Sequence, residues 1–288
     1  MSNVLVTGGC GFIGSNLVDM LIEQGNSVTV VDNLVTGNKN NCNDKAKYIF
    51  KDYRDVLKNN ELYDFSNIDI IFHLAAMPRI QPSFDDPLYT FNNNASGTAT
   101  LCQFAKENNC KIVYAGSSSY YGGVYLNPYS FSKWIGEEIC MMYSKIYGIS
   151  TCIARFFNVY GPRHLSEGPY STVVAIFENQ YKQQKPLTIT GNGEQRRDFT
   201  HVSDICSGLI AMSKDHYEGK VFNLGTGKNY SINELADLFV DSKKQYIPKR
   251  PGEAWITLAD TKEMRQLTGW QCKHTLAGYI QKFIEKEV

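Results

Sequence analysis

A tyrosine and a lysine, Tyr129 and Lys133, stand four residues apart in a segment with helical periodicity. At this spacing the two side chains lie on one face of a helix. A nearby cation favours phenolate, so the tyrosine could accept a proton near neutral pH. Lowering a phenol pKa from about 10 to about 7 requires roughly 4 kcal/mol, so a second positive charge is needed. An oxidised nicotinamide would supply that charge. Because the same spacing also occurs on ordinary half-buried helices, the assignment requires support from the rest of the chain.

A glycine-rich turn near the N-terminus gives this support. Gly8-Gly9-Cys10-Gly11-Phe12-Ile13-Gly14 follows an apolar strand at residues 3–7 and precedes helical periodicity from Ser15 to Gln24. Glycine lets the backbone turn tightly and approach a pyrophosphate, whose charge the helix N-terminus stabilises. Asp32 ends the next strand, Ser27 to Val31, where a carboxylate binds ribose hydroxyls and repels a 2′-phosphate. These features predict an NAD site.

Strands and helices alternate through the first half of the chain. Further strands are expected at 48–51, 68–73, 111–115 and 150–155, and helices at 87–108 and 130–147. This alternation predicts an α/β fold: a doubly wound parallel sheet of the Rossmann type, with ligands beyond the C-terminal strand ends. By this rule the same edge should carry the glycine turn, Asp32, Asp52, Leu74 to Ala76, Ser117 to Ser119 and Phe156 to Asn158.

The pattern changes after residue 158. Loop-like segments precede a helix expected at 172–183 and a strand at 187–190. We expect residues 1–158 to form the NAD-binding domain, to which the chain returns around 198–225. Residues 159–288 should form mainly a smaller α/β substrate-binding domain. Arg196 and Arg197 have two interpretations, either a solvated strand edge or a clamp on a diphosphate, which suits the planar guanidinium fork.

The composition excludes several classes of partner. The 288 residues carry 29 basic and 29 acidic side chains, which argues against a nucleic acid or an anionic membrane as the main partner. No apolar run approaches the length of a membrane span, and the N-terminus already has the pattern of a strand rather than a signal peptide. The eight cysteines contain no C-x-x-C pair, and the five histidines show no ligand spacing. We therefore expect a cytoplasmic protein with reduced thiols and no metal.

The ordered series of motifs resembles the NAD-dependent sugar epimerase/dehydratase family of extended short-chain dehydrogenases/reductases. Within it, the chain is most similar to UDP-glucose and UDP-N-acetylglucosamine 4-epimerases. The resemblance covers nearly the whole chain and is carried by Thr7–Gly14, Val30–Asn33, Phe72–Ala76, Asn93–Thr98, Pro128–Lys133, Arg155–Arg163, Arg196–Asp204 and Phe222–Gly227.

The resemblance implies roles for individual residues. Tyr129 would be the catalytic base, Lys133 would bind the nicotinamide ribose and lower the tyrosine pKa, and Ser117 would hydrogen-bond the reacting sugar oxygen. The residues implied in cofactor binding are Gly8, Gly11, Phe12, Ile13, Gly14, Asp32, Asn33, Asp52, Tyr53, Leu74, Ala75, Ala76, Asn94, Ser117, Tyr129, Lys133 and Phe156. Those implied in binding a nucleotide sugar, expected to be UDP-linked, are Ser118, Ser119, Asn158, Arg197, Arg250, Glu253 and Thr257.

The implied reaction is inversion at C4 of a UDP-hexose, namely glucose and galactose or their N-acetyl forms. Hydride would pass from C4 to NAD and return to the opposite face of a 4-keto sugar. The serine turn Ser117-Ser118-Ser119 carries no carboxylate, whereas dehydratase relatives have an acid and a base there. The alternatives are a 4-reductase or dehydrogenase, a 4,6-dehydratase, and a non-catalytic nucleotide-sugar-binding protein.

Two further expectations concern substrate size and assembly. The loop between Tyr121 and Tyr129 is shorter than in many relatives, and the small Thr257 would leave room for an N-acetyl group. Helices at 87–108 and 130–147 match those that form a four-helix dimer interface in relatives, so a homodimer is expected. The apolar residues that could cover such a face are Phe91, Leu101, Trp134, Ile135, Met141 and Met142.

Overall fold

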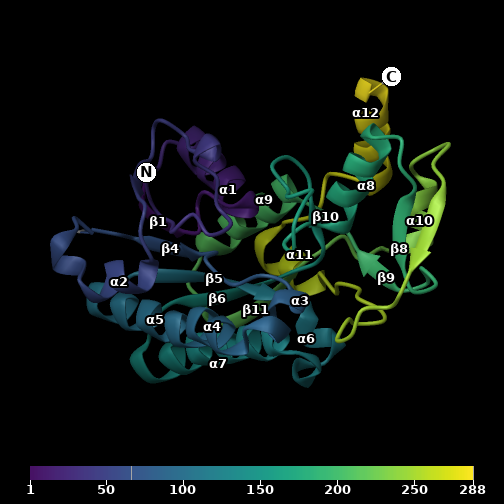
Figure 1. Cartoon of the computed structure of the whole chain (residues 1–288). Coiled ribbons are helices and arrows are strands. Elements are labelled where there is room, and N and C mark those ends of the chain that lie inside the picture. The colour runs from purple at the N-terminus through teal and green to yellow at the C-terminus, as the bar shows by residue number, and fades with distance from the viewer. Residues whose placement is uncertain (66, 288) are drawn as a thin grey trace.

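A parallel sheet forms the centre of the larger part of the molecule (Figure 1). The computed structural model describes residues 1–65 and 67–287, and within them this sheet has seven strands. Their order is β11-β6-β5-β4-β1-β2-β3. The strands are β1 (Asn3–Thr7), β2 (Ser27–Val31), β3 (Lys47–Ile49), β4 (Ile70–His73), β5 (Lys111–Ser117), β6 (Thr151–Phe156) and β11 (Glu218–Leu224).

Helices cover both faces of the sheet, because each strand places alternate side chains on opposite faces. Val4 and Val6 of β1 belong to one apolar cluster, whereas Leu5 between them belongs to the other. The first cluster includes residues of α1 (Phe12–Glu23) and α9 (Val202–Ser213). The second includes residues of α2 (Tyr53–Lys58), α5 (Gly97–Asn108) and α7 (Pro128–Tyr147). The expected doubly wound α/β fold is confirmed.

The strand order reverses between β1 and β4. From β1 the chain proceeds outward to β2 and β3, and it then returns to β4 on the other side of β1 and continues to β5 and β6. In an open parallel sheet, such a reversal leaves a crevice beyond the C-terminal ends of the two strands. Two connecting segments border this crevice, the glycine turn after β1 and the residues that follow His73 at the end of β4.

A smaller part, built around a separate apolar core, contains most of the C-terminal residues. Its core includes Phe177, Phe199, Phe239 and Ile280. Its strands pair as β8 with β13 and β9 with β12, and β7 pairs with β10 beside them. The bounds are β7 (Val159–Tyr160), α8 (Val173–Lys182), β8 (Leu187–Thr190), β9 (Arg196–Asp198), β10 (Thr200–His201), β12 (Asn229–Ser231), α10 (Ile232–Asp237), β13 (Lys244–Ile247) and α12 (Leu276–Glu287). Helix α11 (Lys262–Thr268) instead packs against β11 of the larger part, where Met264 joins the first apolar cluster.

The helix expected at 87–108 is confirmed over these bounds, with a π-helical turn in its middle. It consists of α4 (Pro87–Phe91), a π-helical turn (Asn92–Ser96) and α5. A π-helical turn has one more residue per hydrogen-bonded ring than an α-helix and changes the direction of the side chains around it. Asn93 and Asn94 in this turn are buried, so the turn places two polar side chains in the interior.

Other boundaries differ from the sequence-based expectation by a few residues. Helix α1 begins at Phe12, inside the glycine motif, rather than at Ser15. Helix α7 begins at Pro128 because Asn127 caps it: Oδ1 of Asn127 accepts a hydrogen bond from the Ser130 amide at 2.7 Å. Tyr129 therefore lies in the first turn of α7.

The cysteines are free thiols, and six of the eight are buried. This agrees with their interpretation as ordinary apolar residues. Among the described residues, no helix combines the length and the apolar character that a membrane span requires.

Candidate active site

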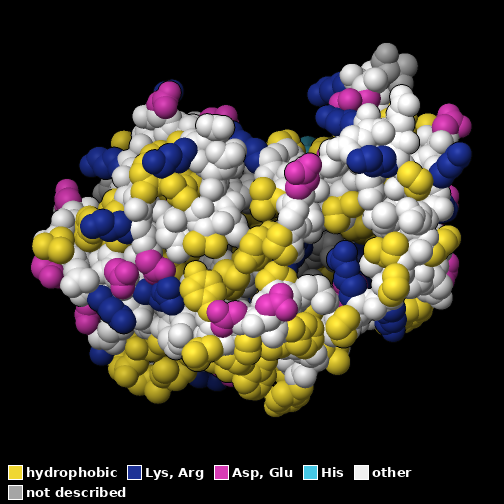
Figure 2. All heavy atoms as spheres, in the orientation of Figure 1, with side chains coloured by type: hydrophobic (Ala, Val, Ile, Leu, Met, Phe, Trp, Pro, Cys, Tyr) yellow, Lys and Arg dark blue, Asp and Glu magenta, His cyan; other side chains and the backbone are white. Residues whose placement is uncertain are grey.

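A cavity of about 480 Å³ lies beyond the C-terminal ends of the sheet strands. Residues of the sheet part line one side, including Gly8, Asp32 and Ser117, and Arg197 and Thr257 line the other side. Figure 2 shows the surface hollowed between the larger and the smaller part. The cavity occupies the place that the strand reversal between β1 and β4 predicts for a ligand.

The glycine turn forms a close-packed floor at one end of the cavity. A Cβ on Gly14 would overlap the carbonyl oxygen of Gly8, and a Cβ on Gly8 would lie 2.7 Å from the Ala75 nitrogen. Gly8 also has a φ of +74°, which favours glycine. The bare backbone and the N-terminus of α1 thus form a cradle with the geometry that a dinucleotide pyrophosphate requires.

Acidic and aromatic residues lie beside this cradle. Asp32 is buried, and its carboxylate accepts hydrogen bonds from the amides of Cys10 (2.9 Å) and Leu34 (2.8 Å). A carboxylate can accept about four hydrogen bonds, so two ribose hydroxyls can still bind. Tyr53 lines the cavity and donates from its hydroxyl to the Asn93 carbonyl at 2.7 Å. These residues fit the adenosine half of NAD.

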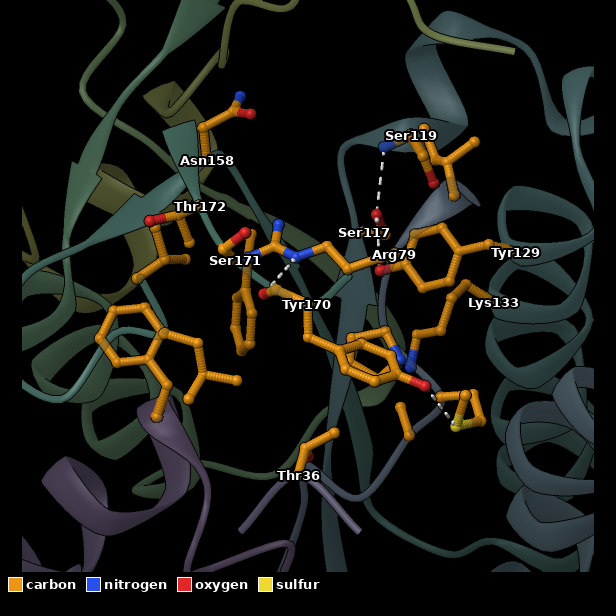
Figure 3. A pocket seen from close by; sticks show the side chains of 18 of the residues that line it. Thr36, Arg79, Ser117, Ser119, Tyr129, Lys133, Asn158, Tyr170, Ser171 and Thr172 are labelled. Atoms are coloured by element: carbon orange, nitrogen blue, oxygen red, sulfur yellow. Dashed lines mark hydrogen bonds between the residues drawn. The ribbon is translucent and has the colours of Figure 1, made fainter. Parts of the chain in front are cut away.

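The proton-transfer candidates lie where β5 ends and α7 begins (Figure 3). The Tyr129 hydroxyl donates to Oγ of Ser117 at 3.4 Å, and the same Oγ accepts the Ser119 amide at 3.2 Å. The Ser119 hydroxyl is buried and has no hydrogen-bond partner among the described residues. A buried hydroxyl without a partner beside this cavity is consistent with a polar ligand that completes the site.

Two groups oppose the effect of burial on Tyr129. Burial raises the pKa of Tyr129, while the hydrogen bond with Ser117 and the charge of Arg79 lower it. Lys133 is itself buried, and burial lowers the pKa of Lys133 to about 8 although Glu137 acts in the opposite direction. The charge of Arg79, a residue that the sequence analysis did not single out, is thus one of the causes that lower the pKa of Tyr129.

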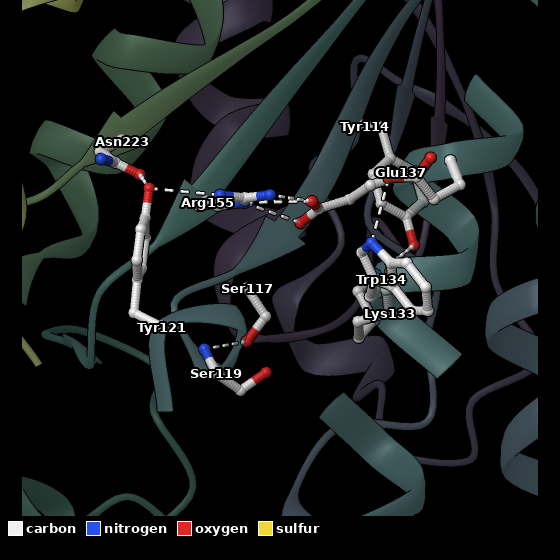
Figure 4. Close-up of polar contacts among 10 residues, drawn as sticks. Tyr114, Ser117, Ser119, Tyr121, Lys133, Trp134, Glu137, Arg155 and Asn223 are labelled. Carbon is white, nitrogen blue, oxygen red and sulfur yellow. Dashed lines mark hydrogen bonds and ion pairs between the residues drawn. The ribbon is translucent and has the colours of Figure 1, made fainter. Parts of the chain in front are cut away.

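Lys133 lines the cavity and lies beside a buried network of charged and aromatic side chains (Figure 4). Its Nζ lies 4.3 Å from the centre of the Tyr114 ring. Glu137, one turn further along α7, forms an ion pair with Arg155 at 2.6 Å, and the Glu137 side chain is only 1% exposed. Arg155 also donates to the Tyr121 hydroxyl at 3.2 Å. This network fixes α7 against β6 and sets the charge environment of Lys133.

The segment that follows β4 contributes Arg79, which the sequence analysis did not single out. Arg79 lines the cavity, and its Nε donates to the Tyr170 carbonyl at 3.1 Å. Its φ of +84° is unusual for a residue with a side chain. One feature of the sequence could have pointed to Arg79: it lies five residues after Leu74, at the sheet edge that was already expected to bind ligands.

On the opposite wall of the cavity, the residues expected to bind the substrate interact with one another. Asn158 donates to Oγ1 of Thr257 at 3.3 Å, and Thr257 is buried. Nη2 of Arg197 lies 3.5 Å from Oε2 of Glu253, and Arg197 also donates to the Trp255 carbonyl at 3.3 Å. Arg250 is exposed at the rim of the cavity.

The short loop before α7 forms part of the cavity wall. Gly122 and Leu126 line the cavity, and Nδ2 of Asn127 donates to the Gly252 carbonyl at 2.9 Å. The loop is thus tied to the segment that carries Arg250 and Glu253, so its length affects the position of both. Tyr125 at its tip is 82% exposed.

Most of the predicted site residues line this one cavity, and two do not. Asp52 caps α2 and is held by Arg54, with 2.6 Å between Nη2 and Oδ2. Asn94 is buried behind the cavity, where it accepts the Met77 amide at 2.8 Å and donates to Ser132 at 3.0 Å. The lining residues among those predicted are Gly8, Gly11, Phe12, Ile13, Gly14, Asp32, Asn33, Tyr53, Leu74, Ala75, Ala76, Ser117, Ser118, Ser119, Tyr129, Lys133, Phe156, Asn158, Arg197, Arg250, Glu253 and Thr257.

Comparisons with known proteins agree with this architecture. A family model described as the NAD dependent epimerase/dehydratase family matches residues 4–225. A putative UDP-glucose 4-epimerase of Methanocaldococcus jannaschii is 34% identical, over 98% of this chain and 97% of that protein. The UDP-glucuronic acid decarboxylase 1 of Danio rerio is 30% identical, over 98% of this chain and 72% of that protein.

A solved structure gives the same result for the fold. The UDP-glucose 4-epimerase of Thermotoga maritima, crystallised with UDP-glucose, superimposes with a TM-score of 0.92 at 29% identity. The similarity covers 99% of both chains.

Proposed function

The chain belongs to the NAD dependent epimerase/dehydratase family, and on this basis we propose that it inverts C4 of a UDP-linked hexose. One observation carries the proposal: Tyr129 and Ser117 meet at 3.4 Å in the cavity, and the turn beside them has serines and no carboxylate. This arrangement can remove and return the proton of one hydroxyl. It offers no acid and base for the loss of water from the neighbouring carbons.

NAD is the cofactor of this family, and the cavity fits it. Gly8, Gly11 and Gly14 with the N-terminus of α1 would hold the pyrophosphate, and Asp32 would hold the adenosine ribose. The carboxylate of Asp32 also disfavours a 2′-phosphate, which supports NAD rather than NADP. When bound there, NAD would supply reversible hydride transfer at C4, which would permit either configuration at that carbon.

The protein groups would handle the proton and the orientation of the sugar. Tyr129, as phenolate, would accept the proton of the 4-hydroxyl and later return it. Ser117 would hydrogen-bond the same oxygen and keep it beside the phenol. Lys133 would bind the nicotinamide ribose. Tyr129 and Ser117 would hold the oxygen at C4 during both the removal and the return of its proton, so the same pair would serve either configuration.

The remaining predicted contacts would hold the nucleotide during this exchange. We assign Arg197 and Arg250 to the diphosphate, Glu253 to the nucleotide ribose, and Asn158 and Thr257 to the sugar side. Residues 159–288 would then act mainly as the substrate-binding domain, with the chain returning to the NAD-binding domain around 198–225. The pairing of β11 with β6 supports that return.

Two experiments test the proposal. The protein is incubated with UDP-, GDP-, dTDP- and CDP-linked hexoses without added nicotinamide, and inversion at C4 is followed by NMR. We expect a UDP-sugar to be inverted and Tyr129→Phe to lower the rate by about 10²–10⁴-fold with NAD still bound. Net release of NADH or loss of water would indicate a dehydrogenase or a dehydratase. Full activity of Tyr129→Phe would refute the role of Tyr129.

We also propose that the protein is a homodimer joined through α7 and its neighbour α5. Figure 2 shows hydrophobic side chains gathered along the lower face, where α7 lies in Figure 1. Ile146 is 66% exposed and Met142 is 39% exposed, whereas Leu101, also expected on this face, is fully buried in the core. A closed isologous pair would cover these residues. Light scattering should give twice the mass of the chain, and a monomer mass at micromolar concentration would contradict the proposal.

A further inference from the structure

The guanidinium of Arg79 reaches across the middle of the cavity close to the catalytic candidates. Figure 3 shows Tyr129 and Ser117 on one side of it and Ser171 on the other. The charge of Arg79 acts on the pKa of Tyr129, and the phenol acts on that of Arg79 in turn. Arg79 lines the same cavity as Tyr129 and Ser117, so a sugar held by that pair would lie beside this guanidinium.

The charge of Arg79 has no anionic partner among the described residues. Nε is occupied by the Tyr170 carbonyl at 3.1 Å, and no carboxylate pairs with the two Nη atoms. Arg197 on the opposite wall differs, because Glu253 lies 3.5 Å from it. A half-buried guanidinium with an open Nη edge is suited to bidentate binding of an anion, and leaving it unpaired is costly.

The backbone at Arg79 is also strained. A φ of +84° costs a residue with a side chain of order 1–3 kcal/mol, and such strain is found mainly where function requires a fixed geometry. At this position the backbone conformation directs the Arg79 side chain into the cavity from the loop that follows β4. The position of the cation is therefore held by the fold as well as by the hydrogen bond to Tyr170.

A nucleotide sugar offers two kinds of anion to this arginine, the diphosphate and a carboxylate on the sugar. If Tyr129 receives the proton of the 4-hydroxyl, the neighbouring ring carbon C5 and its substituent C6 lie beside the phenol. The diphosphate is separated from C4 by the width of the ring. Arg197 and Arg250, on the far wall and rim, are the groups placed to meet it.

We propose that Arg79 binds a carboxylate at C6 of the sugar, so that the preferred substrates are nucleotide-linked hexuronic acids rather than neutral hexoses. The inference rests on the proposed 4-epimerase function, because it uses the position of C4 beside Tyr129. It narrows the class of sugar substrates to hexuronic acids, and it assigns a specificity-determining role to a residue outside the recognised motifs.

Binding measurements separate the two anions. UDP, UDP-glucose and UDP-glucuronate are titrated calorimetrically into the purified protein and into Arg79→Met and Arg79→Lys. Arg163→Met serves as the matched control, because Arg163 also has a positive φ (70°) but pairs with Asp19 at 2.7 Å and does not line the cavity. Thermal melting and NAD content check that each variant is folded and loaded.

We expect UDP-glucuronate to bind 10- to 100-fold more tightly than UDP-glucose, which is the order of a charge-assisted hydrogen-bonded pair. Arg79→Met should abolish this difference, while its affinities for UDP and UDP-glucose stay within about threefold of those of the unmodified protein. Arg79→Lys should retain part of the preference for the acid. Arg163→Met should bind like the unmodified protein. Because Arg79 also acts on Tyr129, turnover is compared as the ratio of kcat/KM for UDP-glucuronate to kcat/KM for UDP-glucose. In Arg79→Met this ratio should fall by the same factor as the preference in binding.

Other outcomes would overturn either the role of Arg79 or the proposed 4-epimerase function, and they distinguish the two. If Arg79→Met weakens UDP and both sugars equally, Arg79 contacts the diphosphate and the inference is wrong. If the unmodified protein inverts neutral UDP-hexoses and shows no preference for the acid, the inference is wrong and the 4-epimerase function stands. If the acid binds through Arg79 but its C4 is never inverted, the proposed function fails while the anion site stands.

Discussion

The hydroxyl of Tyr129 lies 3.4 Å from Oγ of Ser117, although the two residues belong to different elements, α7 and β5. Asn127 sets one side of this contact by capping α7. The amide of Ser119 sets the other side by donating to the Ser117 oxygen. Because both partners are fixed by the backbone, the pair presents a prearranged position for a substrate hydroxyl.

Replacement of Ser117 by alanine should change the pH dependence of the reaction. The hydrogen bond with Ser117 lowers the pKa of Tyr129 against the effect of burial, so its loss raises that pKa. Tyr129 acts as a base, and activity is therefore lost below its pKa. We expect the acid limb of the kcat/KM profile of Ser117→Ala to move to higher pH. A profile that only falls in height would argue against this role.

A second pH effect should come from Lys133. Burial lowers its pKa to about 8 from the ordinary 10.5, and Glu137 opposes this shift. Activity that needs the charged amine should decline as the pH rises through about 8, and Glu137→Gln should move the decline to lower pH. Between about 8 and 10.5 the unfolded chain binds this proton and the folded chain does not. The contribution of Lys133 to stability therefore rises with pH there, which denaturation at several pH values would detect.

The buried ion pair of Glu137 and Arg155 should be far more important for stability than an exposed pair. Arg155→Met leaves Glu137 without its partner and should lower the free energy of unfolding by about 3–5 kcal/mol. Lys220 and Glu263 form a matched exposed pair at 2.8 Å, and Lys220→Met should cost less than about 1 kcal/mol. Urea denaturation of both variants checks this, and equal losses would contradict it.

Two glycine variants should separate cofactor binding from backbone strain. In Gly14→Ala the new Cβ would overlap the Gly8 carbonyl oxygen, so the cradle must open and NAD affinity should fall more than tenfold. Gly25 has a φ of +81°, and a Cβ added there would have no neighbouring atom within 4 Å, so Gly25→Ala should cost about 1 kcal/mol in stability and leave NAD binding intact. Calorimetric titration of NAD and thermal melting measure both effects. Retention of NAD by Gly14→Ala would exclude the cradle as its site.

Local patterns in the sequence were sufficient to predict the fold class and much of the cavity lining. The glycine turn, Asp32 and the alternation of strands and helices are short-range features, and the rule for parallel sheets places their ends at one edge. Tyr129 and Lys133 were found for the same reason, because their spacing matches one turn of a helix. These signals depend on neighbouring residues in the chain and so can be recognised without coordinates.

Tertiary structure alone decided the remaining features, because they depend on residues distant in sequence. The π-helical turn that brings Asn94 inward interrupts an otherwise helical pattern, and Glu137 meets Arg155 only after α7 packs on the sheet. Arg79 has neither a periodic pattern nor a motif of its own. Its position beside Tyr129 results from the reversal of strand order at β1 and β4, a left-handed backbone conformation and a hydrogen bond to Tyr170. The charge in the cavity is therefore a property of the folded chain that no local pattern encodes.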